Sequence, residues 1–213
     1  CGGGHLLRDL ALSVGSEGQA IGLDPSEQQI KAAQELCQDL DNVKFSRDSA
    51  TELSFEDNTF HGVASIQVLE YIPDVDAALA EVHRVTRPGG RLAAVSVLWD
   101  HWRFHGPDSK LNDQMHEAFK AHCSHQMLPL EMPAKLTQHG FVGAHCTPMG
   151  FMNNSLHHNS FAWLASGLLT HFAQKQGIAK EDVQRWREQL DQSVKEGRFG
   201  FVSVPVLTTA IAS

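Results

Sequence analysis

Short apolar runs alternate with helix-like segments along the first hundred residues. Four of these runs predict strands, at residues 19–23, 43–45, 62–68 and 91–98. Apolar side chains recur every three or four residues over residues 26–40 and 75–85, which predicts two helices. Ser26 and Gln29 have the spacing of a capping box at the start of the first helix. The run Arg87-Pro88-Gly89-Gly90 predicts a turn between the second helix and the next strand. This alternation is typical of an α/β fold with a mostly parallel sheet and helices on both faces.

The pattern changes in the second half of the chain. Residues 101–139 are polar, rich in histidine and partly helical in pattern, and residues 141–151 predict another strand. Residues 157–196 predict helical structure, with an apolar stripe along the second half. The stripe consists of Val183, Trp186, Leu190 and Val194. The last strand, residues 199–211, contains Pro205. Because proline donates no ladder hydrogen bond, we expect this strand, or a bulge in it, at the margin of the sheet.

Composition and charge exclude several function classes. The 213 residues include 17 Lys and Arg against 25 Asp and Glu, a formal net charge of -8. A nucleic-acid binder neutralises phosphates with clustered basic side chains, so this acidic balance argues against one. No run approaches the ~18 to 20 uncharged apolar residues that span a bilayer, so we expect no membrane-spanning segment. The four cysteines are widely spaced and too few for a disulfide scaffold, which favours a reduced, cytoplasmic compartment.

Glycines at the start of the chain lead directly into a helical pattern. The run Cys1-Gly2-Gly3-Gly4 precedes it, and glycines there let a ligand approach the backbone closely. Asp24 lies 20 residues after Gly4, at the end of the next predicted strand, where a carboxylate accepts both ribose hydroxyls of an adenosine. Dinucleotide folds need a small residue where this chain has Leu7, which counts against NAD or FAD. A plain helix start with a surface aspartate is the alternative interpretation.

Five motifs together resemble those of class I S-adenosylmethionine-dependent methyltransferases, in the broad small-molecule (type 11) group that includes quinone-biosynthesis enzymes. They follow one another through residues 1–98: Cys1-Gly2-Gly3-Gly4, Gly22-Leu23-Asp24-Pro25-Ser26, Asp48-Ser49-Ala50, Gln67-Val68-Leu69-Glu70-Tyr71-Ile72-Pro73-Asp74 and Arg87-Pro88-Gly89-Gly90-Arg91-Leu92. The resemblance implies a Rossmann-like fold, S-adenosyl-L-methionine as cofactor and a small-molecule substrate. The acidic residue and first glycine of the family's opening motif are absent. We therefore expect the first strand to be missing or truncated at the N-terminus.

The resemblance also implies a division of the domain. Residues 1–98 form the cofactor-binding Rossmann-like core. Residues 99–213 form the substrate-side half of the same domain, with a helical lid (99–140 and 152–197) inserted between the last strands, followed by closing strands. Methionine and phenylalanine are frequent over residues 149–172, within this lid. That composition favours a small apolar or aromatic substrate.

Eight residues are implied by the resemblance as cofactor contacts: Gly2, Gly4, Asp24, Asp48, Ser49, Ala50, Gln67 and Val68. In that assignment Asp24 accepts the ribose hydroxyls, Asp48 accepts the adenine amino group, and Gln67 flanks the methionyl end. Ligands of open α/β sheets bind outside the carboxyl ends of the strands. The predicted strand-end positions of these three residues agree with the assignment.

Four weaker candidates for catalysis lie near the ends of the later strands: Tyr71, Asp100, His101 and His105. Trp99 and Trp102 stand beside three of them, an arrangement that can cradle a cation or deprotonate a hydroxyl. Tryptophans that cover the core and imidazoles in solvent are the alternative. Ten of the 13 histidines lie between His101 and His171, but no pair has zinc-site spacing, so we expect no metal site.

Three functions are compatible with these motifs. Methyl transfer by in-line displacement needs no fixed catalytic triad, because the sulfonium carries its own leaving group. A catalytically inactive, cofactor-binding regulatory or scaffold subunit is the alternative, although such a subunit is expected to lose Asp24 and Asp48. A nicotinamide oxidoreductase is opposed by Leu7 and by the lack of a Tyr-x-x-x-Lys pair, since the single tyrosine, Tyr71, is followed four residues later by Val75.

Overall fold

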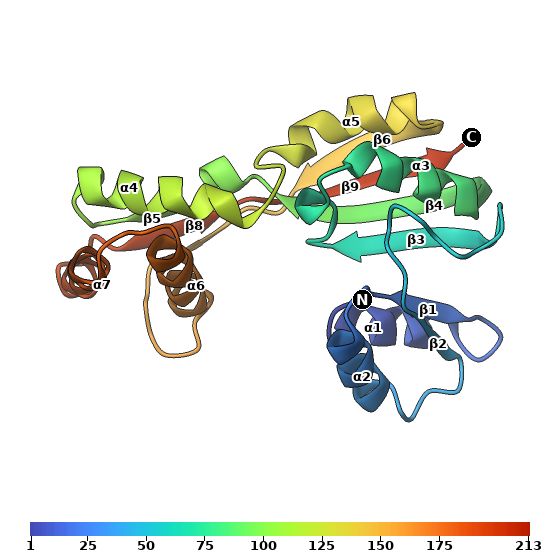
Figure 1. Cartoon of the computed structure of the whole chain (residues 1–213), viewed down its shortest axis with the longest axis horizontal. Coiled ribbons are helices and arrows are strands. Elements are labelled where there is room, and N and C mark those ends of the chain that lie inside the picture. The colour runs from blue at the N-terminus through green and yellow to red at the C-terminus, as the bar shows by residue number, and fades with distance from the viewer.

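Seven α-helices and nine strands make up the computed structural model, which describes residues 1–213 (Figure 1). The α-helices are α1 (His5–Val14), α2 (Glu27–Leu36), α3 (Val75–Val85), α4 (Ser109–Phe119), α5 (Leu128–Gln138), α6 (Phe161–Lys175) and α7 (Lys180–Lys195). The strands are β1 (Ala20–Leu23), β2 (Val43–Ser46), β3 (Phe60–Ile66), β4 (Thr86–Val97), β5 (Arg103–His105), β6 (Phe141–Pro148), β7 (Phe151–Asn153), β8 (Gly200–Ser203) and β9 (Pro205–Ala212). Short 3-10 helices are η1 (Leu69–Tyr71), η2 (Trp99–His101) and η3 (Lys120–His122).

Backbone hydrogen bonds divide the strands among three sheets. β1 pairs with β2 in parallel. The largest sheet has the order β3-β4-β9-β6, in which β3 and β4 are parallel and β9 is antiparallel to both of its neighbours. β6 therefore runs parallel to β4. The third sheet, β5-β8-β7, is antiparallel. Outside this third sheet the strands are mostly parallel and alternate with helices, which confirms the predicted Rossmann-like α/β class.

β1 and β3 are both edge strands. Each has a single partner, β2 and β4 respectively, and Figure 1 shows the β1–β2 unit lying beside the β3 edge of the four-stranded sheet. Residues 1–4 form a turn that leads into α1. A buried strand is predicted over residues 62–68, but β3 is only partly buried and Ile66 is 51% exposed. A strand at the edge of a sheet has a partner on one side only. It is therefore less buried than a continuous apolar run predicts.

The helices α3 and α5 lie against the four-stranded sheet (Figure 1). Their apolar faces pack on β4, β6 and β9 in one hydrophobic core, which includes Leu79, Leu92, Leu136, Phe141 and Ala210. Every second residue of β9 is buried, as expected for a strand with one covered face. This core packs against the middle of β4, at Leu92 and Ala94.

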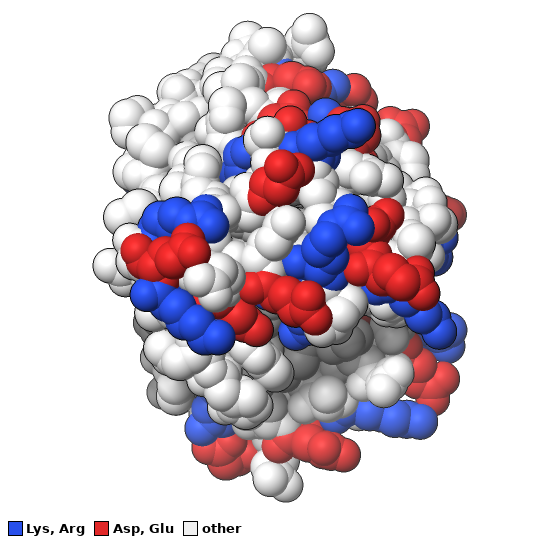
Figure 2. All heavy atoms as spheres, turned by 90° about the vertical axis from the view of Figure 1, so that its left-hand side faces the viewer, with Lys and Arg blue, Asp and Glu red and all other residues white.

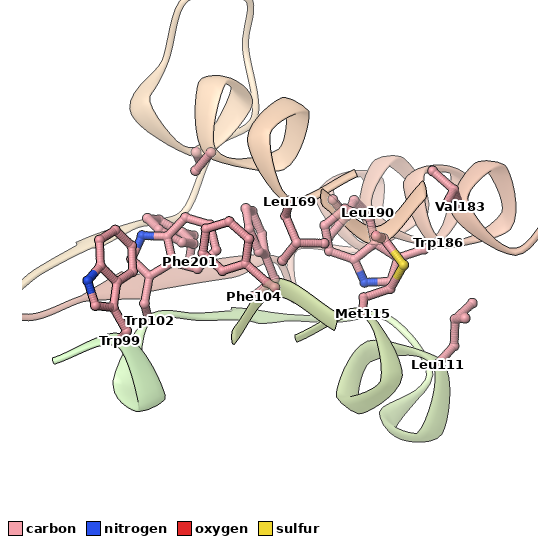
Figure 3. Packing of buried hydrophobic residues seen from close by; sticks show 14 of the residues in the cluster. Trp99, Trp102, Phe104, Leu111, Met115, Leu169, Val183, Trp186, Leu190 and Phe201 are labelled. Carbon is pink, nitrogen blue, oxygen red and sulfur yellow. The ribbon is translucent and has the colours of Figure 1, made fainter. Parts of the chain in front are cut away.

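A second hydrophobic core lies in the lobe that β5, β7 and β8 form with α4, α6 and α7. Figure 3 shows aromatic and aliphatic side chains from η2, β5, β8 and the three helices packed against one another. Its fully buried members include Phe104, Met115, Leu169, Trp186 and Phe201. This separate core makes the second lobe a packed unit in its own right.

The helical segment predicted over residues 157–196 consists of two helices, α6 and α7. α6 ends before Gly177, whose φ of +86° belongs to the left-handed region that glycine adopts readily. The predicted stripe on α7 is buried at its first three positions, whereas Val194 near the end of the helix is exposed.

Two strand predictions in the second half are corrected. Residues 141–151 form β6 and β7, which belong to different sheets. Residues 199–211 likewise divide into β8 and β9, and β9 lies between β4 and β6 instead of at the sheet margin. Pro205 is tolerated in this central strand because it is the first residue, opposite Val97, where a missing N–H removes no interior ladder bond.

The run Arg87–Gly90 lies inside β4. The prediction that this run forms a turn between a helix and a strand is therefore wrong. The pairing of β4 with β3 shifts register between Phe60 and Gly62, and Gly89 has a φ of +78°. Proline and glycine thus form an irregularity within a strand. These residues are common in such irregularities as well as in turns.

Gly4→Ala is expected to destabilise the fold. Gly4 caps α1 with a φ of +89°, and an added Cβ would lie 2.8 Å from the Cα of Ala33 on α2. The left-handed backbone alone costs a non-glycine residue about 1–2 kcal/mol, and the clash with α2 adds to it. Urea unfolding checks the loss. In the control Gly2→Ala, φ is +53° but no heavy atom lies within 4 Å of the added Cβ. Equal losses in both variants would contradict a packing role for Gly4.

Candidate functional site

The two predicted aspartates follow the carboxyl ends of β1 and β2. Leu23 pairs with Ser46 at the ends of these strands, and the Asp24 N–H donates to the Ser46 carbonyl at 3.3 Å. Asp48 lies two residues beyond Ser46. Both carboxylates therefore follow neighbouring parallel strands at one edge of a sheet, where open α/β folds bind ligands.

Backbone N–H groups hold Asp24 in its ionised form. Its Oδ2 accepts from the Gly2 N–H and its Oδ1 from the Ser26 N–H, both at 2.9 Å. The amino group of Cys1 lies 3.0 Å from Oδ2. Burial by itself raises the pKa of Asp24, but these donors together outweigh it and hold the pKa below its usual value. Each oxygen of an ionised carboxylate has two lone pairs, and Oδ1 accepts only from Ser26, so Oδ1 keeps the capacity to accept a ligand hydroxyl.

The glycines beside Asp24 are required for different reasons. Gly2 has a φ of +53°, and the space where its Cβ would lie is open. The same position at Gly4 is filled by Ala33 of α2, so packing between α1 and α2 already explains that glycine. Of the two glycines in the predicted site, Gly2 is the one with an open side that suits a ligand.

Two hydroxyl groups orient Asp48. Ser46 and Ser54 each donate to its Oδ2 at 2.6 Å, and both lower the pKa of the carboxyl group. The next residue, Ser49, is exposed, whereas Ala50 packs against the core of the four-stranded sheet. Asp48 is thus an ionised acceptor on a loop that reaches from β2 toward the larger sheet.

Gln67 and Val68 follow β3, in a different sheet from the aspartates. Gln67 has a φ of +52°, unusual for a residue with a side chain, and its N–H donates to the Val95 carbonyl at 2.7 Å. Val68 is exposed. Residues held in this region of backbone space cost about 1–3 kcal/mol and cluster at functional sites. The end of β3 is therefore a strained, partly exposed turn beside β4.

The four catalytic candidates do not form one cluster. Tyr71 lies on η1, directly after the strained turn, and burial together with the charge of Glu70 raises the pKa of its phenol. The phenol is therefore protonated at neutral pH. Asp100 and His101 are exposed on η2, and His105 is exposed at the end of β5 in the second lobe.

Trp99 and Trp102 are buried members of the second core, with ring centroids 5.8 Å apart. This burial agrees with the alternative interpretation, in which the tryptophans cover the core, and the hypothesis that they cradle a cation stays a prediction. They also line a surface cavity of about 250 Å³. The charged groups around this cavity pair with one another, as in Lys120 with Glu117 at 3.1 Å, so it offers no unpaired charge to a ligand.

On the face formed by the second lobe, Lys and Arg side chains are interspersed with Asp and Glu (Figure 2). This face has no continuous basic area of the kind that tracks phosphates. No group of three or more His, Cys, Asp or Glu side chains is arranged to hold a metal ion. None of the helices combines the length and the hydropathy needed to cross a bilayer.

Sequence reasoning missed two groups that shape this region. Ser54 was not considered because it lies six residues after Asp48, in a loop without periodicity. Glu70 was noted only as part of a motif, yet it is fully buried. The signal that could have found it is a carboxylate placed directly after an apolar strand.

The ion pair between Arg84 and Glu81 on α3 holds the loop that contains Ser54. The Arg84 guanidinium donates to the carbonyls of Leu53 and Phe55 at 2.9 and 2.7 Å, and to both Glu81 oxygens at 2.7 Å. The Leu53 N–H donates to Glu81 Oε2 at 2.8 Å. This forked pair fixes Ser54, and through it the orientation of Asp48.

Glu81→Gln is expected to flatten the acid limb of the stability curve. The hydrogen bond from Arg84 lowers the pKa of Glu81 to about 2. A carboxyl group whose pKa is lowered on folding stabilises the fold above its unfolded pKa, and this contribution disappears as pH falls from about 5 toward about 2. Urea midpoints measured across that range check the prediction. The exposed Glu131→Gln on α5 is the control, and identical curves for the wild type and the Glu81 variant would refute it.

Known proteins are similar to this chain in sequence and in fold. A family model described as a methyltransferase domain matches residues 1–94, from the glycine turn through most of β4. Residues 1–94 are therefore similar to a methyltransferase domain. The matched part of the chain contains Asp24, Asp48 and Gln67, so all three strand-end positions described above lie within it.

Sequence relatives match the same part of the chain. The demethylmenaquinone methyltransferase of Staphylococcus aureus (strain MRSA252) is 38% identical over 97 residues, which are 46% of this chain and 40% of the relative. The chain thus matches about two fifths of the length of this curated relative.

Solved structures match nearly the whole chain. The YcgJ protein of Bacillus subtilis has a TM-score of 0.63 at 18% identity, covering 99% of this chain and 88% of its own. Phosphoethanolamine N-methyltransferase 2 of Haemonchus contortus, in complex with S-adenosyl-L-methionine, has a TM-score of 0.62 at 19% identity. That match covers 99% of this chain and 46% of the other. At these identities the similarity establishes the Rossmann-like fold.

Proposed function

We propose that this protein transfers a methyl group from S-adenosyl-L-methionine to a small molecule. One observation carries the proposal. In a chain whose first 94 residues match the methyltransferase family, the ionised Asp24 lies at the carboxyl end of β1, beside the open backbone of Gly2. A carboxylate in that position accepts ribose hydroxyls, and a glycine without neighbours leaves room for the ligand.

The residues present suit the cofactor. Asp24 binds the ribose hydroxyls, and its Oδ1 keeps a lone pair that is free to accept one of them. Asp48, held ionised by two serine hydroxyls, accepts the adenine amino group. The turn of Gln67 and Val68 flanks the methionyl end. We assign residues 1–98 to the cofactor and residues 99–213 to the substrate, although α5, β6 and β9 of the second part complete the four-stranded sheet.

Methyl transfer requires that the chain position the reactants and exclude water from them. When bound, S-adenosylmethionine supplies a methyl group on a sulfonium, whose sulfur keeps the bonding electron pair as the acceptor attacks in line. The task of the chain is to hold the acceptor in line, which contributes up to about 7–11 kcal/mol in favourable cases. A general base is needed only for a protonated acceptor. Tyr71, protonated at neutral pH, suits the donation of a hydrogen bond to the acceptor and not the removal of a proton.

We infer a small apolar or aromatic acceptor. Exposed apolar side chains follow one another along β7 and α6, in the segment assigned to the lid: Phe151, Met152, Phe161, Leu164 and Leu168. The rings of Phe151 and Phe161 lie 5.2 Å apart, so the two elements share one apolar surface. Demethylmenaquinone, which the name of the Staphylococcus aureus relative specifies, is the first acceptor to test.

All four cysteines are free, which supports a reducing, cytoplasmic compartment.

Calorimetry with S-adenosylmethionine, S-adenosylhomocysteine and NAD tests the proposal. We expect the first two ligands to bind and NAD not to bind. Transfer of a labelled methyl group to quinones, phenols and amines then tests catalysis. Binding without transfer to any acceptor would favour a catalytically inactive, cofactor-binding subunit, and selective binding of NAD would overturn the proposed function.

A further inference from the structure

Glu70 is the one Asp, Glu, Lys or Arg residue among the buried residues of this chain, with none of its surface exposed. It lies on η1, three residues after the strained Gln67 at the end of β3. Its neighbour Leu69 belongs to the core of the four-stranded sheet, whereas Val97 and Trp99 belong to the core of the second lobe. Glu70 therefore lies where the two hydrophobic cores meet.

Hydrogen bonds from two segments converge on this residue. The Ser96 hydroxyl donates to Glu70 Oε2 at 2.8 Å, and the Val97 N–H donates to Oε1 at 3.3 Å. The Glu70 carbonyl accepts from the N–H groups of Ser124 and His125, each at 3.0 Å. A single residue thus joins the end of β3 to the end of β4 and to the segment that precedes α5.

A buried carboxylate contributes little net free energy to the stability of a fold. Its desolvation opposes folding, and an apolar side chain of similar volume often stabilises such a position equally well or better. The adjacent turn supplies a reason for keeping it. Gln67 is held at a φ of +52°, a conformation that persists only where the surroundings determine it. The carboxylate lies three residues away and is anchored to β4, so it restrains that turn.

We propose that Glu70 is a positioning residue for the cofactor: by bonding Ser96 and Val97, it holds the strained turn of Gln67 and Val68 in the conformation that flanks the methionyl end. This inference rests on the proposed function. The inference adds Glu70 to the residues of the proposed site. Its carboxylate is fully buried and acts through the backbone of Gln67 and Val68.

Two substitutions at this position separate hydrogen bonding from volume. In Glu70→Gln the amide oxygen still accepts the Val97 N–H, and the amide N–H donates to the Ser96 oxygen, because a serine hydroxyl acts as donor or acceptor. Glu70→Leu has a similar size but loses both bonds. The glutamine variant should therefore rescue the function that the leucine variant loses.

The experiment compares affinity for S-adenosylhomocysteine by calorimetry and stability by urea unfolding. We expect Glu70→Leu to raise the Kd by about tenfold or more, the scale of two lost buried hydrogen bonds. We expect Glu70→Gln to remain within about twofold of the wild type, because its bonds are retained. With an acceptor in hand, the leucine variant should raise the KM for S-adenosylmethionine more than it lowers kcat.

Thr86→Val is the matched control for a purely structural effect. Thr86 is a buried residue at the opposite, amino end of β4, and its hydroxyl donates to the Val82 carbonyl. This variant loses a buried hydrogen bond in the same strand, so it should lose stability without losing affinity. If Glu70→Leu does not fold, Ser96→Ala tests the same contact and should weaken binding in the same direction.

The outcomes distinguish the two proposals. A wild-type protein that does not bind S-adenosylhomocysteine overturns the proposed function, and the role of Glu70 with it. A wild type that binds, with unchanged affinity in Glu70→Leu or Ser96→Ala, overturns the role of Glu70 alone. An equal loss of affinity in Thr86→Val and Glu70→Leu likewise overturns the role of Glu70 and leaves the proposed function standing.

Discussion

Asp24→Ala is expected to raise the Kd for S-adenosylhomocysteine by about 10- to 150-fold. The range corresponds to the roughly 1.5–3 kcal/mol of a hydrogen bond to a charged group. Asp24 is ionised in the fold, and its two oxygens are oriented by the N–H groups of Gly2 and Ser26. Alanine removes the acceptor for the ribose hydroxyls and also frees Gly2, so both effects act in the same direction. Calorimetry at neutral pH measures the change.

Two further variants define what this result means. Asp24→Asn keeps one oxygen that accepts hydrogen bonds, so its affinity should fall between those of the wild type and the alanine variant. Asp41→Ala removes an exposed carboxylate just before β2 and should leave the affinity unchanged. An Asp24→Ala protein with wild-type affinity would show that this carboxylate lies outside the ligand site. Thermal unfolding of each variant separates loss of affinity from loss of fold.

Trp186→Ala should lower the free energy of unfolding by about 3–5 kcal/mol, the usual cost of truncating a buried large aromatic residue. The Trp186 side chain is fully buried in the second core (Figure 3). Its ring meets Phe104 edge-to-face at 5.2 Å, and its Nε1 donates to Asn112 Oδ1 at 2.9 Å. The substitution leaves a cavity and takes the donor away from a buried amide oxygen. Urea unfolding at constant pH gives the difference.

Trp163→Ala is the matched control for this substitution. Trp163 lies on α6 in the same lobe but is partly exposed, so its truncation should cost clearly less. Under conditions where both variants are folded, affinity for S-adenosylhomocysteine should stay within about twofold of the wild type, because neither residue lies on the elements of the proposed cofactor site. Equal losses of stability in the two variants would contradict the position of Trp186 at the centre of the second core.

Local signals predicted most elements of the first hundred residues correctly. Ser26 caps α2 and accepts a hydrogen bond from the Gln29 N–H, as the capping-box spacing predicts. Asp24 follows the end of its strand as expected, and Asp48 lies two residues beyond the next one. These features depend on residues a few positions apart, whose side chains and backbone interact within one turn or one strand.

The errors arose where partners distant in the sequence determine the structure. The run Arg87–Gly90 reads as a turn by composition, but pairing with β3 extends β4 through it. Pro205 suggests a sheet margin, yet it begins a central strand between β4 and β6. Trp99 and Trp102 stand beside polar residues in the sequence, and only the packing of α4, α6 and α7 shows that they are buried.

The amino-acid sequence alone determined the α/β class, the family resemblance and the strand-end positions of the aspartates, because periodicity, caps and motif spacing are local properties. Only the tertiary structure decided which strands share a sheet and that the second half builds its own hydrophobic core. It also decided that Glu70 connects the ends of β3 and β4. Hydrogen bonds and packing between residues 26 or more positions apart, as between Glu70 and Ser96, leave no regular spacing in the chain from which they can be inferred.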